Sequence, residues 1–134
     1  MPTGPQYSEA MHARRQRITF SVDPAAMRHA ASAWKWAYEN HVTDDPTFTD
    51  WINHILTDYA DAPAVDAPSK PQGRMFWIDR DKAELLPAPR QTPGRSPLFR
   101  AAVAAAVADI EAEADRRGQE IPAVDRLPSK VYRT

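Results

Sequence analysis

The sequence predicts a mainly α-helical fold with a short β-ribbon. Polar and apolar residues alternate along RITFSV at 17–22, which is typical of a strand with one buried face. Two stretches with helical spacing of apolar residues follow, and a second strand-like segment, RMFWID at 74–79, precedes an alanine-rich helix. The 134 residues include 13 prolines, so we expect compact helical pieces joined by stiff connectors.

The first strand has two chemically different sides. Its apolar side carries Ile18, Phe20 and Val22, and its polar side carries Arg17, Thr19 and Ser21. A single strand cannot satisfy its own backbone hydrogen bonds. We therefore expect it to pair with the same strand of a second copy, or with a later strand of its own chain.

Two helices follow the strand. Asp23 and Pro24 are suited to the N-cap and first position of a helix, predicted over 24–41, which places Trp34 on its apolar side. Pro46 breaks this helix, and Thr47 or Thr49 can cap the next one. That second helix lies within TFTDWINHILTDYAD and has apolar residues on one stripe, among them Trp51, Ile52 and Ile55.

The rest of the chain divides at prolines and glycines. We predict a disordered N-terminal arm at 1–13, a first domain at 14–62 and a proline-rich linker at 63–73. The second half, 74–118, holds the strand at 74–79, one or two helical turns at 82–86 and a long helix at 97–117 that ends at Gly118. An extended tail at 119–134 completes the chain.

The two halves show a weak internal repeat. TFSVD at 19–23 is similar to MFWID at 75–79, and PTFTDWINHILTDY at 46–59 is similar to PLFRAAVAAAVADI at 97–110. In these alignments Phe48 matches Phe99, and Ile52 matches Val103. Coincidence between amphipathic helices remains open beside a degenerate second copy. A true repeat predicts an intramolecular pseudo-dimer with an asymmetric ribbon, because Met75 and Trp77 would face outward from the second strand.

A strand followed by two helices suggests how DNA is bound. Two paired strands form a ribbon of the right width for the major groove, with the apolar sides buried on the helices. The expected base-reading residues are Arg17, Thr19 and Ser21, and the expected phosphate contacts are Arg14, Arg15, Thr47 and Thr49, the last two at a helix N-terminus. The expected dimer core consists of Ile18, Phe20, Val22, Trp34, Trp51, Ile52 and Ile55.

RITFSVDP followed by two helices resembles the ribbon-helix-helix DNA-binding proteins of the Arc, MetJ and CopG type. Within that fold, DDPTFTDWINHIL and the tail EADRRGQEIPAV resemble actinobacterial plasmid ParB-type centromere-binding proteins. The resemblance implies a dimeric DNA-binding unit whose ribbon reads the major groove. This chain departs from the family in having DDP where a glycine usually lies between the helices, and Asp44, Asp45 and Asp50 would repel a phosphate unless they point away or act as caps.

Composition restricts the remaining possibilities. There is no cysteine, which is compatible with a cytoplasmic protein, and no segment suggests a signal peptide or a membrane span. The formal net charge of −1 by itself argues against a nucleic-acid binder, but Arg14, Arg15 and Arg17 form a basic cluster at the start of the strand. The four histidines are scattered, so we expect no metal. The sequence has no glycine-rich phosphate loop, no Ser-His-Asp arrangement and no paired carboxylates on predicted loops, so we expect no cofactor and no enzyme activity.

The expected function is sequence-specific binding to repeated sites in double-stranded DNA, for plasmid or phage partition or for autoregulation of an operon as a transcriptional regulator. A homodimer or higher oligomer, and a partition ATPase, would be its partners. Two alternatives remain: an antitoxin-type repressor whose C-terminal half binds a toxin, and a structural or adaptor protein that does not bind DNA.

Overall fold

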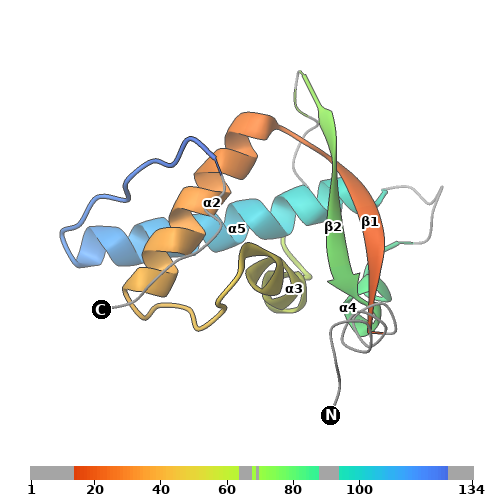
Figure 1. The fold of residues 1–134 in the computed structure, drawn as a ribbon, viewed down its shortest axis with the longest axis horizontal. Coiled ribbons are helices and arrows are strands. Elements are labelled where there is room, and N and C mark those ends of the chain that lie inside the picture. Colours follow the sequence, from red (N-terminus) through yellow and green to blue (C-terminus); the bar gives the residue numbers. More distant parts are fainter. Residues whose placement is uncertain (1–13, 64–67, 69, 88–93, 127–134) are drawn as a thin grey trace, which may run out of the picture.

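The computed structural model describes residues 14–63, 68, 70–87 and 94–126, and the expected N-terminal arm lies outside them, as do parts of the linker and of the tail. A two-stranded sheet lies at one side of the molecule, with helices packed on one of its faces (Figure 1). The predicted mainly α-helical fold with a short β-ribbon is confirmed. The elements in chain order are β1 Arg15–Val22, α2 Pro24–Glu39, α3 Phe48–Asp58, β2 Gln72–Asp79, α4 Arg80–Ala83 and α5 Arg95–Arg116.

The strand that pairs with β1 is β2 of the same chain. The two strands are antiparallel, and Thr19 lies opposite Met75 at the middle of the ribbon. These two residues also match one another in the alignment of TFSVD with MFWID. The register is therefore the one that a two-fold axis between two copies of the strand would produce, here within a single chain.

The predicted caps begin the helices. The Asp23 carboxylate accepts a hydrogen bond from the backbone N–H of Ala25 (3.2 Å), and the Thr47 hydroxyl accepts one from the backbone N–H of Asp50 (3.1 Å). α2 ends two residues earlier than predicted because His41 adopts a left-handed backbone conformation, with φ 61°, and the chain turns away. The backbone N–H of Val42 then donates to Ala37 O (2.8 Å) and closes the helix end.

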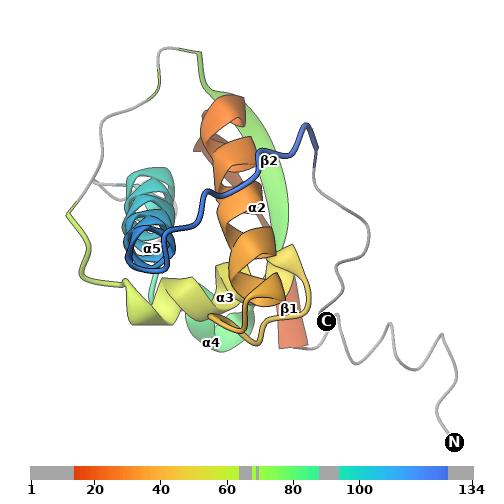
Figure 2. The same cartoon turned by 90° about the vertical axis from the view of Figure 1, so that its left-hand side faces the viewer.

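α5 runs beside both earlier helices, as Figures 1 and 2 show. Its C-terminus has the predicted glycine stop, since Gly118 has φ 67° and the backbone N–H of Gln119 donates to Ala114 O (2.9 Å). Small buried residues such as Ala102 and Ala106 allow the helix to approach its neighbours closely. None of the helices in the described ranges is sufficiently long and apolar to cross a lipid bilayer.

One hydrophobic core joins the two halves of the chain. Phe99 of α5 stacks on Phe20 of β1 with ring centroids 4.0 Å apart, and Phe48 of α3 lies 6.1 Å from Phe76 of β2. Each half thus places its helix phenylalanine against the strand phenylalanine of the other half. The segments predicted as separate domains at 14–62 and 74–118 therefore share a core.

The residues expected to form a dimer core are buried within a single chain. Their side chains need no second copy to cover them, because β2 and α5 supply the apolar surface that a partner would otherwise provide. This corrects the assignment of these seven residues to an interface between copies: Ile18, Phe20, Val22, Trp34, Trp51, Ile52 and Ile55.

The second half has the same order of elements as the first, a strand followed by two helices, but its first helix is shorter. α4 has 4 residues where α2 has 16, and it begins two residues before the one or two turns predicted at 82–86. After α5, residues 119–126 cross over α2 (Figure 2). The backbone N–H of Val124 donates to the buried hydroxyl of Ser32 (3.0 Å), and the Trp36 indole N–H donates to the Gln119 side chain (3.1 Å). These two hydrogen bonds hold residues 119–126 against α2.

Candidate nucleic-acid interface

By alternation, four cross-strand pairs belong to the outer side of the ribbon: Arg15 with Asp79, Arg17 with Trp77, Thr19 with Met75, and Ser21 with Gly73. Arg17, Thr19, Met75 and Gly73 are exposed, whereas Ser21 and Trp77 are half-buried. The structure therefore brings the three expected base-reading residues, Arg17, Thr19 and Ser21, onto one surface.

Arg17 lies over an aromatic ring. Its guanidinium carbon is 5.6 Å from the centroid of the Trp77 indole, within the range of a cation–π contact. Stacking uses the flat face of the guanidinium and leaves its N–H groups, which lie in the plane, free to donate to a ligand. Trp77 thus restricts the conformations of Arg17 without occupying its hydrogen-bond donors.

Ser21 lies at the end of the ribbon, where its backbone is tied to α5. Its backbone N–H donates to the Ser96 hydroxyl (2.8 Å), and its carbonyl accepts from Arg100 Nη1 (2.7 Å). At the opposite end, the Asn53 amide of α3 donates to Trp77 O (3.0 Å) and accepts from the backbone N–H of Asp79 (2.7 Å). α5 therefore holds one end of the ribbon and α3 holds the other, each through residues of its N-terminal half.

Arg15 alternates onto the same side of β1 as Arg17, but two carboxylates hold its guanidinium, which corrects the expectation that it contacts a phosphate. Its Nη2 is 2.8 Å from the Asp50 carboxylate, and its Nε is 2.7 Å from the Asp79 carboxylate. The Arg15 side chain is only 14% exposed. A guanidinium held by two carboxylates joins β1, α3 and β2, and it offsets part of the negative charge of Asp50 at the start of α3.

The remaining expected phosphate contacts lie at the surface or close to it. Arg14 is exposed at the start of β1, and Thr47 is exposed as the N-cap of α3. Thr49 is half-buried, and its carbonyl accepts from the Asn53 amide (2.9 Å). Thr47 therefore acts first as a cap, and Arg14 and Thr47 are the exposed members of this group.

Basic residues around the second strand were missed by the sequence interpretation. Lys70 and Arg80 are exposed at the two ends of β2. Arg74 lines a cavity of about 380 Å³ with Arg28 and Arg126, from three different segments; Asp125 also lines it. The sequence could have indicated basic residues at this strand, because K-P-Q-G-R precedes MFWID much as the basic R-R-Q-R precedes ITFSV.

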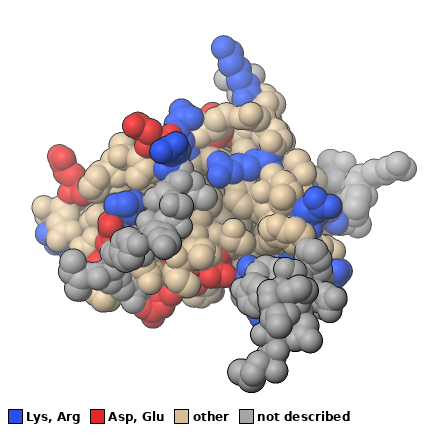
Figure 3. Space-filling view, in the orientation of Figure 1, with Lys and Arg blue, Asp and Glu red and all other residues tan. Residues whose placement is uncertain are grey.

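Charge is unevenly distributed over the surface. On the face shown in Figure 3, the side where the ribbon lies displays Lys and Arg with little Asp or Glu, whereas both signs are mixed over the helices. The molecule as a whole carries a formal net charge of −1. A near-neutral chain can therefore still present a basic surface around its ribbon.

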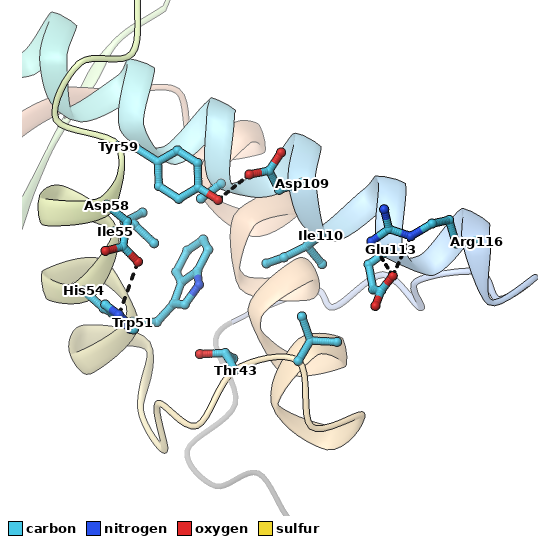
Figure 4. Close-up of a pocket in the computed structure, with 12 residues that line it drawn as sticks. Thr43, Trp51, His54, Ile55, Asp58, Tyr59, Asp109, Ile110, Glu113 and Arg116 are labelled. Atoms are coloured by element: carbon cyan, nitrogen blue, oxygen red, sulfur yellow. Dashed lines mark hydrogen bonds and ion pairs between the residues drawn. The ribbon is translucent and has the colours of Figure 1, made fainter.

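A second cavity, of about 260 Å³, lies between α3 and α5 and has a different character (Figure 4). Its lining includes Asp58, Asp109 and Glu113. The Tyr59 hydroxyl donates to Asp109, and burial together with this carboxylate raises the pKa of Tyr59 to about 12. Arg116 and His54 also line the cavity, but the three carboxylates outnumber them, and an excess of negative charge does not suit a nucleic acid.

Two further comparisons bear on the site. In the part of the chain that the structure describes, no three His, Asp or Glu side chains are grouped so that they could hold a metal ion. Comparison of the chain with protein-family models, with curated proteins and with solved structures gave no significant match.

Proposed function

We propose that this protein binds double-stranded DNA by inserting the β1–β2 ribbon into the major groove, in the manner of a single-chain ribbon-helix-helix protein. The observation that carries the proposal is the ribbon itself. One face is buried on the helices, and the other presents Arg17 and Thr19 to solvent. A two-stranded ribbon fits the width of the major groove, where arginine recognises guanine and threonine can donate or accept.

The surroundings of the ribbon support the same ligand. Arg14, Lys70 and Arg80 are exposed at its ends, where the phosphate backbones that border the groove would pass. Asp50 and Asp79, which lie close by, share the single positive charge of Arg15, which compensates one of their two negative charges. The small number of basic groups implies modest affinity for one site, so tight binding would require several molecules on repeated sites.

A single chain supplies the whole ribbon, so the smallest unit that binds DNA is one molecule rather than a homodimer. Plasmid or phage partition and operon autoregulation both use proteins arrayed on repeated sites, and we propose this setting, with a partition ATPase as the protein partner. The antitoxin alternative needs the chain after residue 62 to be available for a toxin. One face of β2 and one face of α5 are instead buried in the core, which does not favour it.

Fluorescence anisotropy with labelled duplexes of random sequence, and then with a selected sequence, tests the proposal. We expect binding that weakens steeply between about 50 and 200 mM salt. Arg17→Ala should weaken binding to the selected duplex by about 1–3 kcal/mol, at least fivefold in Kd, while the fold is kept.

Arg116→Ala is the matched control, because it removes the same charge from an exposed position at the far end of α5. It should leave the affinity within about twofold of the wild type. Absence of salt-dependent DNA binding in the wild-type protein would overturn the proposal and favour a structural or adaptor role.

A further inference from the structure

An exposed apolar side chain occupies the centre of the ribbon face. Met75 is 44% exposed and lies opposite Thr19. Its neighbours along β2, Phe76 and Ile78, are buried, as the alternation of a strand requires. The other large hydrophobic residues that the described structure exposes, Val42 and Leu85, lie outside the ribbon.

The surface around Met75 is smooth on one side and basic on the other. Gly73 has no side chain, and a Cβ there would come within 3.3 Å of the Thr19 methyl group, tighter than an ordinary van der Waals contact. On the other side, Arg17 covers Trp77. Met75 therefore projects from the middle of the face, between Gly73, which has no side chain, and the guanidinium of Arg17.

Among the four bases, thymine alone presents a methyl group in the major groove. Methionine has an unbranched, polarizable side chain that adapts to small apolar surfaces. The basic groups at the ends of the ribbon favour a polyanionic ligand over an apolar protein surface. We infer that Met75 contacts the C5-methyl group of a thymine when the ribbon lies in the groove. This inference rests on the proposed DNA binding.

The two strands then read different chemistry. β1 offers the hydrogen-bonding groups of Arg17 and Thr19, whereas β2 offers Met75 and, at Gly73, no side chain. A ribbon made of two identical strands would recognise a palindrome, since each strand presents the same groups. This ribbon selects a non-palindromic site that includes thymine at the position facing Met75.

The test begins with selection of duplexes from a random library by the wild-type protein. The selected duplex is then synthesised with each thymine in turn replaced by deoxyuridine, which removes only the methyl group. We expect one or two positions at which this change weakens binding about threefold to fivefold. Met75→Ala should bind the thymine duplex as weakly as the wild type binds the deoxyuridine duplex, and should not distinguish the two.

Leu85→Ala is the control, because it removes an exposed leucine away from the ribbon and should keep the wild-type preference for thymine. Equal binding to the thymine and deoxyuridine duplexes at every position overturns the inference and leaves DNA binding intact. Binding without any sequence preference, or a Met75→Ala protein that still prefers thymine, overturns it as well. A wild-type protein that binds no duplex overturns both the inference and the proposed function.

Discussion

Phe99→Ala tests whether one chain forms the whole core. The Phe99 side chain is fully buried. Its ring stacks on that of Phe20, with centroids 4.0 Å apart, and lies tilted against that of Phe76, with centroids 5.3 Å apart. Truncating a phenylalanine in such a site removes its transfer free energy and leaves a cavity. We therefore expect the free energy of unfolding to fall by about 3–5 kcal/mol. A domain of this size is typically stable by about 5–15 kcal/mol, so the loss is large.

Urea denaturation followed by tryptophan fluorescence measures this loss, since the chain has 4 tryptophans. With a slope of about 2 kcal/mol per molar urea, the midpoint should fall by about 1.5–2.5 M. Leu85→Ala, at a residue that is 51% exposed, should change the unfolding free energy by less than about 0.5 kcal/mol. Phe99→Leu retains most of the volume and keeps the test readable if Phe99→Ala does not fold.

A loss below about 1 kcal/mol for Phe99→Ala would refute the reasoning. It would mean that α5 does not cover the ribbon in solution. The apolar face of β1 would then be buried against another surface, for example in a homodimer.

Three further predictions concern the ribbon ends and the surface of α3. Arg15→Met leaves the carboxylate of Asp50 without its cation and should cost about 1–3 kcal/mol in urea unfolding, with less than additive loss when combined with Asp50→Asn. Asn53→Ala removes two hydrogen bonds to the β2 backbone and should cost about 1–3 kcal/mol in the same assay; an unchanged midpoint would show that Asn53 does not hold this end of the ribbon. The hydrogen bond to Asp45 raises the pKa of His54 above 6.5, helped by the nearby carboxylate charges and opposed by burial. The stability that protonated His54 contributes is therefore complete below pH 6.5 and lost as the pH rises through the raised pKa. The stability difference between wild type and His54→Gln should shrink from about pH 6 to pH 8, and a difference independent of pH would count against this.

The sequence alone determined the local structure. Alternation predicted β1 and its two faces, and candidate caps at Asp23 and at Thr47 or Thr49 predicted where two helices begin, to within two residues for the second. The glycine stop at Gly118 was equally readable. These features depend on residues only a few positions apart, because propensity, capping and periodicity are properties of a short segment. The burial of the apolar residues of β1 followed for the same reason.

Only the tertiary structure decided which strand β1 pairs with and which arginine of its basic cluster reaches solvent. Any strand with a free edge can satisfy β1, so local sequence cannot distinguish a second copy from β2. Arg15 and Arg17 look alike in the sequence, yet Arg15 is held by carboxylates 35 and 64 residues away. Contacts at such separations depend on the packing of the whole chain around one core, which decides where each charge finally lies.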